Sequence, residues 1–320
     1  MKTDAEVTAH GVRPRSKRRR SNSALRGFFG NGKALVGFVI FALFVFVGIF
    51  AGVIAPYDPS SANFGPSLTP SMAHLLGTTN TGQDIFSQFI WGTQTSLIVG
   101  VGAAIVSTLI AFLVGVYGGY KGGAADSILN AISNIFLVMP GLALLILIES
   151  YVKTSTPLLN GLIIALTGWA WGARVFRSVA MSIASRDFIV AARLSGAGTF
   201  RIMFAEILPN MTSQIAGNLI YSCLGAIMAE AGLAYLGFES IASNSWGTIL
   251  FWAQNGGAML NGAWWWFVPP GLAIALVGTS LALMNFGIDQ ITNPRLRVQK
   301  RKNLKRKGES LLESGGTHHV

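Results

Sequence analysis

Six long stretches of this chain are almost free of charged residues, and their length constrains what it can fold into. They cover residues 34–55, 96–119, 127–148, 158–173, 214–238 and 268–288, with Glu230 as the one exception. A helix rises ~1.5 Å per residue, so about 20 residues cross the ~30 Å hydrocarbon core of a bilayer. Most of the stretches reach that length, and the fourth is marginal. Their length and their lack of alternating polarity favour helices over a barrel.

Composition supports the same class of protein. Hydrophobic residues make up 51% of the 320-residue chain and charged residues only 12%. Ordinary soluble domains carry roughly 25% charged residues. We therefore expect an all-α membrane protein with six transmembrane helices, which crosses a cell membrane several times.

Lysine and arginine residues orient these helices. If both termini are cytoplasmic, every Lys and Arg except Lys153 falls in a tail or loop on the inner side. Positive residues in short loops mark the cytoplasmic side, so the sequence predicts an N-in, C-in topology. The predicted parts are a basic cytoplasmic tail (1–33), a first transmembrane helix (34–55), an extracellular loop (56–95), a five-helix core (96–289) and a second basic cytoplasmic tail (290–320). Within the loop, residues 84–91 have an apolar side that predicts a short helix lying in the membrane interface.

No group of residues has the spacing of a catalytic or metal site. Cys223 lies inside a predicted span, which leaves no disulfide framework or thiolate metal site. Residues 27–34 have the spacing of a phosphate-binding loop, but Ala34 lacks the hydroxyl that such a loop directs at Mg²⁺. The net charge of +11 resides largely in tails that would lie near anionic lipid, so we expect no nucleic-acid partner. We expect a membrane protein that is not an enzyme and holds no cofactor or metal itself.

A polar segment on the cytoplasmic side interrupts the apolar pattern. It reads SRDFIVAARLSGAGTFRIMFAEILPN and spans residues 185–210. The pattern predicts two short helices within residues 185–209. We expect Ser185 and Thr199 to cap these helices, and Asp187 to complement the positive end of the first one.

The two short helices are expected to meet at a sharp reversal. Gly196 and Gly198 permit this reversal, and Pro209 ends the second helix. The apolar contacts are predicted to come from Phe188, Ala191, Ala192, Phe200, Met203 and Phe204. Such a small surface, held against the membrane, is typical of a docking site for a soluble partner. The alternative is an amphipathic loop that rests on lipid, but the small alanine pair argues against it because lipid anchoring uses bulky residues.

Several stretches of the chain resemble, in the same order, the motifs of one family. They are LLGTTNTGQDIFSQFIWGTQTSLIVG (75–100), AARLSGAGTFRI with ILPN (191–202 and 207–210), AEAGLAYLGF (229–238), SWGTIL (245–250) and NPRLR (293–297). Over roughly residues 30–297 the chain resembles the permease subunits of ABC importers, in particular the C-type permease of dipeptide and oligopeptide transporters.

This resemblance implies a particular assembly. The chain would be a six-helix permease bundle of the type I importer class, in a bacterial cytoplasmic membrane, paired with a sister permease as a heterodimer. Two cytoplasmic ABC ATPases, which carry the ATP and Mg²⁺, would dock beneath residues 185–209, and an extracellular solute-binding protein would deliver the cargo. Transport would proceed by alternating access. On this basis the ATPase-coupling residues are Asp187, Phe188, Ala191, Ala192, Gly196, Phe200, Arg201, Phe204, Glu206 and Pro209.

The chain departs from the family pattern at some of these positions. Val190 stands where an acidic residue usually precedes the paired alanines, so Asp187 is the candidate replacement for a salt bridge to the ATPase. Glu206 stands where relatives have a histidine. Arginines of the external motif are replaced by Gln83, Gln88 and Gln94. The outer mouth is therefore predicted to be nearly uncharged.

The sequence leaves the cargo open between two classes. Peptides come first because of the resemblance, and oligosaccharides are the alternative because the outer region is rich in tryptophan and amide side chains. Tryptophan at a membrane boundary is also a common interfacial anchor. An ion-coupled secondary transporter is less expected, since it would show paired intramembrane charges or inverted repeats. The candidate residues of the substrate path are Glu230, Asn218, Tyr221, Met228 and Trp246.

Three features inside the spans have structural as well as functional interpretations. Glu230 either lines and gates the path or forms a hydrogen bond that locks the fifth helix to a neighbour, and both remain open. Pro140 predicts a kink in the third span. Gly115 and Gly119 predict close contact between helices.

Overall fold

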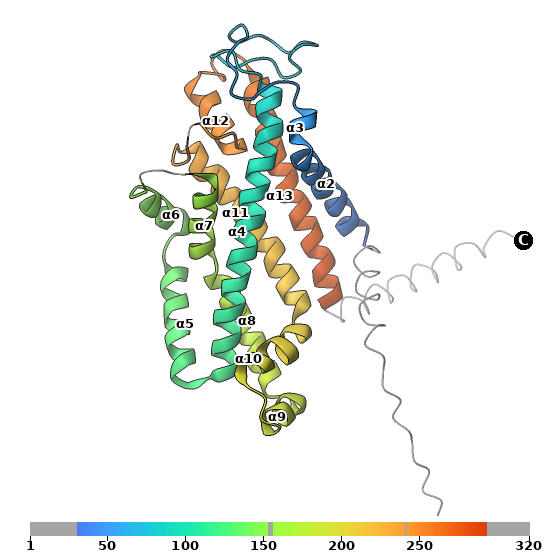
Figure 1. The fold of residues 1–320 in the computed structure, drawn as a ribbon, viewed down its shortest axis with the longest axis vertical. Coiled ribbons are helices and arrows are strands. Elements are labelled where there is room, and N and C mark those ends of the chain that lie inside the picture. The colour runs from blue at the N-terminus through green and yellow to red at the C-terminus, as the bar shows by residue number, and fades with distance from the viewer. Residues whose placement is uncertain (1–30, 153–155, 241, 293–320) are drawn as a thin grey trace, which may run out of the picture.

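The computed structural model describes residues 31–152, 156–240 and 242–292 of the chain. Nearly all of the two predicted basic tails, and Lys153, lie outside the described residues. Within those ranges the structure consists of helices joined by turns and loops, with one isolated β-bridge between Thr78 and Asp84 (Figure 1). The prediction of an all-α protein is confirmed.

The helices form an elongated bundle (Figure 1). In chain order they are α2 (Gly32–Ile49), α3 (Ala51–Ile54), α4 (Ile85–Lys121), α5 (Gly123–Val138), α6 (Gly141–Glu149), α7 (Pro157–Gly168), α8 (Ala170–Ala184), α9 (Asp187–Leu194), α10 (Thr199–Arg201), the π-helical turn η1 (Ile202–Ile207), the 3₁₀ turn η2 (Leu208–Asn210), α11 (Thr212–Tyr235), α12 (Trp246–Asn255) and α13 (Trp264–Thr292). By length and composition, α2, α4, α11 and α13 can each cross a membrane, and the bent pairs α5–α6 and α7–α8 bring the number to six if each pair is one span.

Both bent spans break at identifiable residues. Pro140 lacks an N–H and cannot continue the hydrogen-bond ladder of α5, so α6 leaves at 88° to it. The predicted kink is therefore confirmed, although its size was not foreseen. The break between α7 and α8 falls at Trp169, bends the span by 44° and was not predicted. The Trp169 ring packs against Phe136 of α5, with ring centroids 5.4 Å apart.

The separate interfacial helix predicted at residues 84–91 does not exist. Those residues form the first turns of α4, which continues unbroken to Lys121. Asp84 begins α4 because its Oδ2 accepts hydrogen bonds from the Ser87 backbone N–H and from the Ser87 hydroxyl, at 2.8 and 2.7 Å. Ile85 is fully buried against α12 residues and Trp266, so protein rather than lipid covers this apolar side.

Helix α4 lies at the centre of the bundle and packs along α8, α11, α7 and α2. Its contact with α8 is close enough to be limited by backbone. A Cβ placed on Gly115 would lie 2.3 Å from the Ala173 carbonyl oxygen, and one on Gly119 would lie 2.5 Å from that of Arg177. The predicted role of these two glycines in close helix packing is confirmed.

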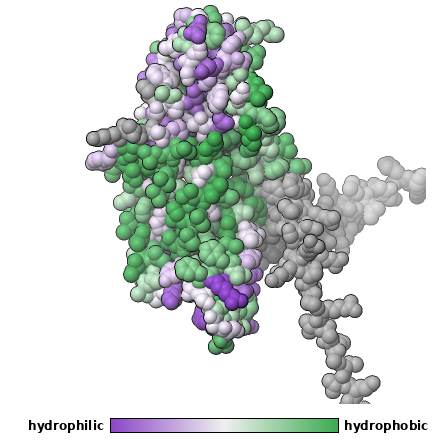
Figure 2. All heavy atoms as spheres, in the orientation of Figure 1, coloured by the Kyte–Doolittle hydropathy of each residue, from purple (hydrophilic) through white to green (hydrophobic). Residues whose placement is uncertain are grey.

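The surface fits a protein that spans a lipid bilayer. On the face shown in Figure 2, an apolar band girdles the middle of the molecule and hydrophilic residues gather at its two ends. Helix α2 illustrates the band, because Val36, Val39 and Leu43 are exposed although the helix is highly apolar. Exposure of these apolar side chains to water would be unfavourable, whereas the hydrocarbon region of a membrane accommodates them.

Replacing Gly115 with alanine tests the α4–α8 contact. The added methyl group must push the two backbones apart, and overpacking of this kind costs about 1–3 kcal/mol. We expect a lower thermal unfolding midpoint of the detergent-purified protein. Gly102→Ala on the same helix is the matched control, because a Cβ there meets nothing within 4 Å. Equal midpoints for the two variants would contradict the packing assigned to Gly115.

Candidate coupling surface and solute path

The polar segment predicted as two short helices forms a compact element at one end of the bundle. Figure 1 shows α9 and α10 beyond the end of α8, at the pole opposite α12. The two predicted caps are wrong. Ser185 donates its hydroxyl to the Ser182 carbonyl at 3.1 Å, and the N-cap position of α9 falls on Arg186. Thr199 is already helical, and the N-cap of α10 is Gly198, without a side-chain bond.

The first short helix begins and ends as its other residues predict. Asp187 lies in the first turn of α9, where a negative charge complements the helix dipole. Gly196 has a φ of +80° and donates its N–H to the Arg193 carbonyl at 3.0 Å. The Ala197 N–H bonds the Ala192 carbonyl at 3.1 Å, which completes a Schellman motif. Gly198 has a φ of −68°, which any residue adopts, so the reversal depends on Gly196 alone.

The second half of the segment is less regular than predicted. A single α-helical turn, α10, widens into the π-helical η1 and then tightens into η2, which contains Pro209. The Asn210 side chain donates to the Glu206 carbonyl at 2.7 Å and ties the two turns together. Pro209 therefore ends the helical run within one residue, as predicted, and α11 starts anew at Thr212.

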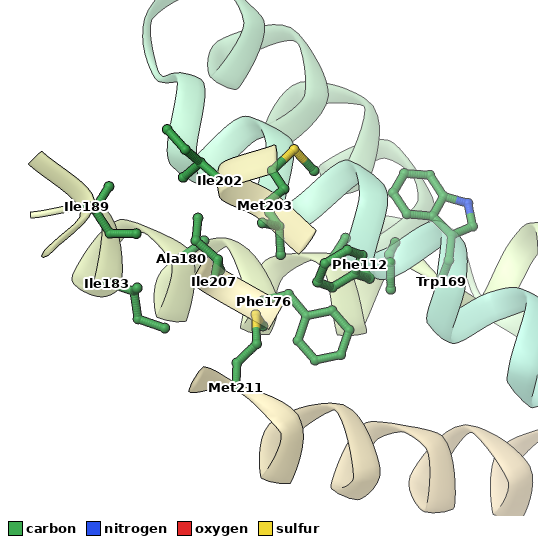
Figure 3. Packing of buried hydrophobic residues seen from close by; sticks show 14 residues of the cluster. Phe112, Trp169, Phe176, Ala180, Ile183, Ile189, Ile202, Met203, Ile207 and Met211 are labelled. Carbon is green, nitrogen blue, oxygen red and sulfur yellow. The ribbon is translucent and has the colours of Figure 1, made fainter. Parts of the chain in front are cut away.

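One side of the segment is anchored in a hydrophobic core. Ile189 of α9 and Ile202, Met203 and Ile207 of η1 are buried against α4 and α8. Figure 3 shows Ile207 and Met211 near Phe176, and Ile189 at the edge of the cluster beside Ile183. Met203 was expected on the contact surface but is buried, because it packs into the core cluster formed with α4 and α8. The anchor fixes the segment to the bundle.

The segment also exposes apolar side chains, and we call this set the coupling face. Its members are Phe188, Val190, Ala191, Leu194, Phe200 and Phe204. Leu194 is 84% exposed and was not foreseen, although its spacing of four residues after Val190 places both on one side of α9. Of the other predicted residues, Arg201 is exposed, whereas Ala192 and Glu206 are half-buried. Exposed apolar groups in this number at one end of a protein mark an interaction surface.

Two contacts that the sequence did not reveal tie the segment and its support to neighbouring helices. The Arg193 guanidinium of α9 lies 5.2 Å from the ring centroid of Tyr120 on α4. Arg177 of α8 makes a bidentate ion pair with Asp126 of α5, through N–O distances of 2.5 and 2.6 Å. Partners far apart in sequence carry no local pattern, so only the fold could show these pairs.

The predicted path residues separate into an exposed and a buried group. Tyr221 and Met228 are 52% and 55% exposed and lie on one face of α11, with exposed Gly225 between them. Asn218 is buried and donates to the Thr108 hydroxyl of α4 at 3.0 Å. Glu230 is fully buried as well. In this conformation only the first pair can meet a solute.

Trp246 does not line a path. Its indole N–H donates to the Thr93 hydroxyl of α4 at 3.2 Å, and its backbone N–H donates to the Ser96 hydroxyl at the same distance. The ring is fully buried and meets Phe44 of α2 edge to face, with centroids 5.7 Å apart. The expectation that Trp246 contacts solute is therefore corrected, because its bulk fills the junction of α2, α4 and α12.

A cavity of about 190 Å³ lies where the two broken spans approach α11. Gly141 and Gly168 contribute to it from the breaks, Ser107 from α4, and Ser222 and Gly225 from α11. Non-helical backbone within a membrane is tolerated where it is buried in protein or lines a wet cavity. This cavity and the exposed face of α11 share Gly225, so together they form one continuous candidate surface for a solute.

A second pocket, of about 300 Å³, opens among the outer loops. Its polar lining consists of uncharged side chains, among them Thr79, Asn80, Gln83 and Asn244. Gln88 donates to the Pro59 carbonyl at 3.3 Å and to the Gln83 side chain at 2.9 Å, so these glutamines organise the outer loop. Gln83 and Gln88, on which the prediction of a nearly uncharged outer mouth depends, both line this pocket.

Comparison with known proteins places this sequence in a family. The family described as "Binding-protein-dependent transport system inner membrane component" matches residues 111–298, and "N-terminal TM domain of oligopeptide transport permease C" matches residues 21–72. The chain is 32% identical to a di/tripeptide transport system permease protein of Pseudomonas aeruginosa, over 85% of this chain and 91% of that protein. It is 32% identical to an oligopeptide and 33% identical to a dipeptide transport system permease protein of Bacillus subtilis, over 86% and 87% of this chain and 89% and 86% of those proteins.

The match spans the coupling segment, the broken helices and α11, which are the features from which the candidate surfaces are built. The chain is therefore a multi-pass protein of the bacterial inner membrane, and it belongs to the family of binding-protein-dependent ABC transport system permeases.

Proposed function

We propose that this chain is one permease subunit of an ABC importer that carries peptides across the inner membrane. The coupling face is the observation that supports this proposal most strongly. It presents apolar side chains at one end of the bundle, on a segment whose buried residues pack into the core with α4 and α8. An apolar surface that is rigidly attached to the bundle suits a partner whose movement must be transmitted to the helices.

The proposed assembly contains partners that supply what this chain lacks. A sister permease completes the path by facing the exposed side of α11, where Tyr221 and Met228 lie. Two ABC ATPases dock on the coupling faces of the two permeases, and they bind the ATP and Mg²⁺. An extracellular solute-binding protein delivers cargo to the outer pocket. This chain itself holds no cofactor and performs no hydrolysis.

Alternating access follows from the way the coupling segment is mounted. When the ATPases close on ATP, their movement reaches Ile189 and η1, which are packed against α4 and α8. The Arg193–Tyr120 contact and the Arg177–Asp126 ion pair carry the same displacement to the ends of α4 and α5. Because α4 also packs along α11, the path-facing helix moves with it. Hydrolysis and product release return the assembly to the inward state.

Peptides are the cargo class that the observations favour. The relatives described above are named for the transport of dipeptides, tripeptides or oligopeptides. The outer pocket offers amide and hydroxyl groups that can pair with a peptide backbone. Oligosaccharides are less favoured because the relatives are named for peptides, although Trp252 and Trp266 line the outer pocket and only Trp246 is withdrawn from it.

A charge placed on the coupling face tests the docking site. In Leu194→Asp the folded chain is unaffected, because 84% of the side chain is exposed, but docking would bury an unpaired carboxylate. That costs about 3 kcal/mol or more, roughly a hundredfold in Kd. We expect loss of the ATPase from the affinity-purified complex. Leu260→Asp, at a loop position 94% exposed at the other pole, is the control and should retain the ATPase. Full ATPase recovery with Leu194→Asp would contradict this docking site.

The reversal after α9 supplies a second test. Proline cannot adopt the positive φ of Gly196 and lacks the N–H that bonds Arg193, so Gly196→Pro breaks the Schellman turn. We expect normal membrane insertion but loss of transport and of cargo-stimulated ATP hydrolysis. Gly198→Ala should behave like the wild type, since its φ is ordinary and a Cβ there meets nothing within 4 Å. Unchanged uptake by Gly196→Pro would count against a coupling role.

Cargo class can be measured directly in reconstituted vesicles. With the partner subunits and ATP present, we expect uptake of labelled dipeptides and oligopeptides and none of labelled oligosaccharides. Oligosaccharide uptake would overturn the cargo assignment alone. Uptake driven by an ion gradient without the ATPases would overturn the importer proposal.

A further inference from the structure

Two carboxyl groups lie buried together at the outer end of α11. Glu230 has an exposed fraction of 0%, and neither of its carboxyl oxygens receives a hydrogen bond of normal geometry. Glu239, in the turn after α11, is also buried and lies within hydrogen-bonding reach of Glu230. An ionised carboxylate without a partner is among the most costly groups to bury. Burial of both carboxyl groups therefore requires that the negative charge of the pair be reduced or compensated.

The chain brings the two glutamates together through its own turn geometry. Helix α11 ends in a Schellman motif, in which the Gly237 N–H bonds the Ala234 carbonyl and the Phe238 N–H bonds the Leu233 carbonyl, both at 3.0 Å. Gly237 has the required positive φ of +82°. The chain reverses there and returns Glu239 to the side of α11 that carries Glu230.

The groups that face this pair from other elements are hydroxyls. Ser96 of α4 and Ser245, the N-cap residue of α12, approach Glu230. The Ser243 hydroxyl lies 2.7 Å from one oxygen of Glu239 and equally close to the Ser240 carbonyl oxygen, and the Ser245 hydroxyl donates to the other oxygen of Glu239 at 3.4 Å. Among the described residues, no lysine, arginine or histidine acts on either carboxyl group. The negative charge of the pair is not balanced by a basic side chain.

Two adjacent carboxyl groups in such a site cannot both ionise, and sharing one proton is the least costly solution. The hydrogen bonds indicate which group carries it. Glu239 accepts from two serine hydroxyls and is stabilised as the anion, although burial raises the pKa of its carboxyl. The Ser96 and Ser245 hydroxyls lie near Glu230 but form no hydrogen bond of normal geometry with it, so a protonated Glu230 that donates to Glu239 satisfies this carboxyl best.

We propose that Glu230 is protonated and donates its proton to the Glu239 carboxylate, and that this clasp fixes the outer end of α11 to the start of α12. Ser245 links the clasp to α12 because the same hydroxyl also accepts from the Thr248 N–H in the capping box at 3.2 Å. Trp246, the next residue, is the buried side chain that seats α12 on α4. Loss of the shared proton would set two negative charges against each other and release this outer corner. Glu230 is thus a positioning residue and does not contact cargo.

Infrared spectroscopy of the purified full-length chain in lipid nanodiscs tests the proposal without any partner protein. We expect the C=O band of a protonated carboxylic acid at neutral pH. Glu230→Gln should abolish the band, because the amide donates to an ionised Glu239. Glu239→Gln should keep the band but shift it to higher frequency, since an amide oxygen is a weaker acceptor than a carboxylate. Asp58→Asn, in the exposed outer loop, is the control and should leave it unchanged.

Three results would overturn the clasp. They are absence of the band from the wild type, survival of the band in Glu230→Gln, and a band that appears only when Na⁺ or divalent cations are removed. The last outcome would show two carboxylates holding a metal cation in place of a proton.

Thermal unfolding supplies an independent measurement of the shared proton. Raising the pH should lower the wild-type midpoint more than that of Glu230→Gln, because only the wild type has the shared proton to lose.

Discussion

Along α4 and α8, Gly115 and Gly119 allow two helix backbones to meet without intervening side chains. This contact aligns Phe112 on one helix with Phe176 on the other, and their rings help to form the core into which the coupling segment inserts. Because Ile189 and η1 pack against the core that these two helices form, the α4–α8 contact determines the position of the coupling face. A wider separation of α4 and α8 would remove the packing surface on which the segment lies. The function proposed for the chain therefore depends on a steric match inside the bundle, far from any partner.

The coupling segment divides its side chains between two tasks. Buried residues such as Met203 bind it to the helices, whereas exposed residues such as Leu194 remain available to another protein. The π-helical turn η1 contains residues of both kinds, since Met203 is buried and Phe204 is exposed.

The sequence was sufficient for what depends on local chemistry. Uncharged length predicted the spans, Pro140 the break in the third span, and Gly196 the reversal after α9. It was insufficient where tertiary packing decides. Ser185 fails as a cap because its backbone continues the end of α8, and Trp246 is buried because Thr93 and Phe44 approach it from distant parts of the chain. The pairing of Glu230 with Glu239 likewise depends on how a glycine turn folds back, which no periodicity encodes.

The bend between α5 and α6 has a consequence for how such a protein can diversify. The two helices share no continuous hydrogen-bond ladder across Pro140, so a tilt of α6 does not have to rotate α5 or the Asp126–Arg177 pair below it. The cavity beside Gly141 can therefore be reshaped by substitutions that leave the machinery at the opposite pole untouched. In the proposed importer, cargo preference and coupling to the ATPases can therefore change independently during evolution, and related permeases with different cargoes can use the same kind of ATPase.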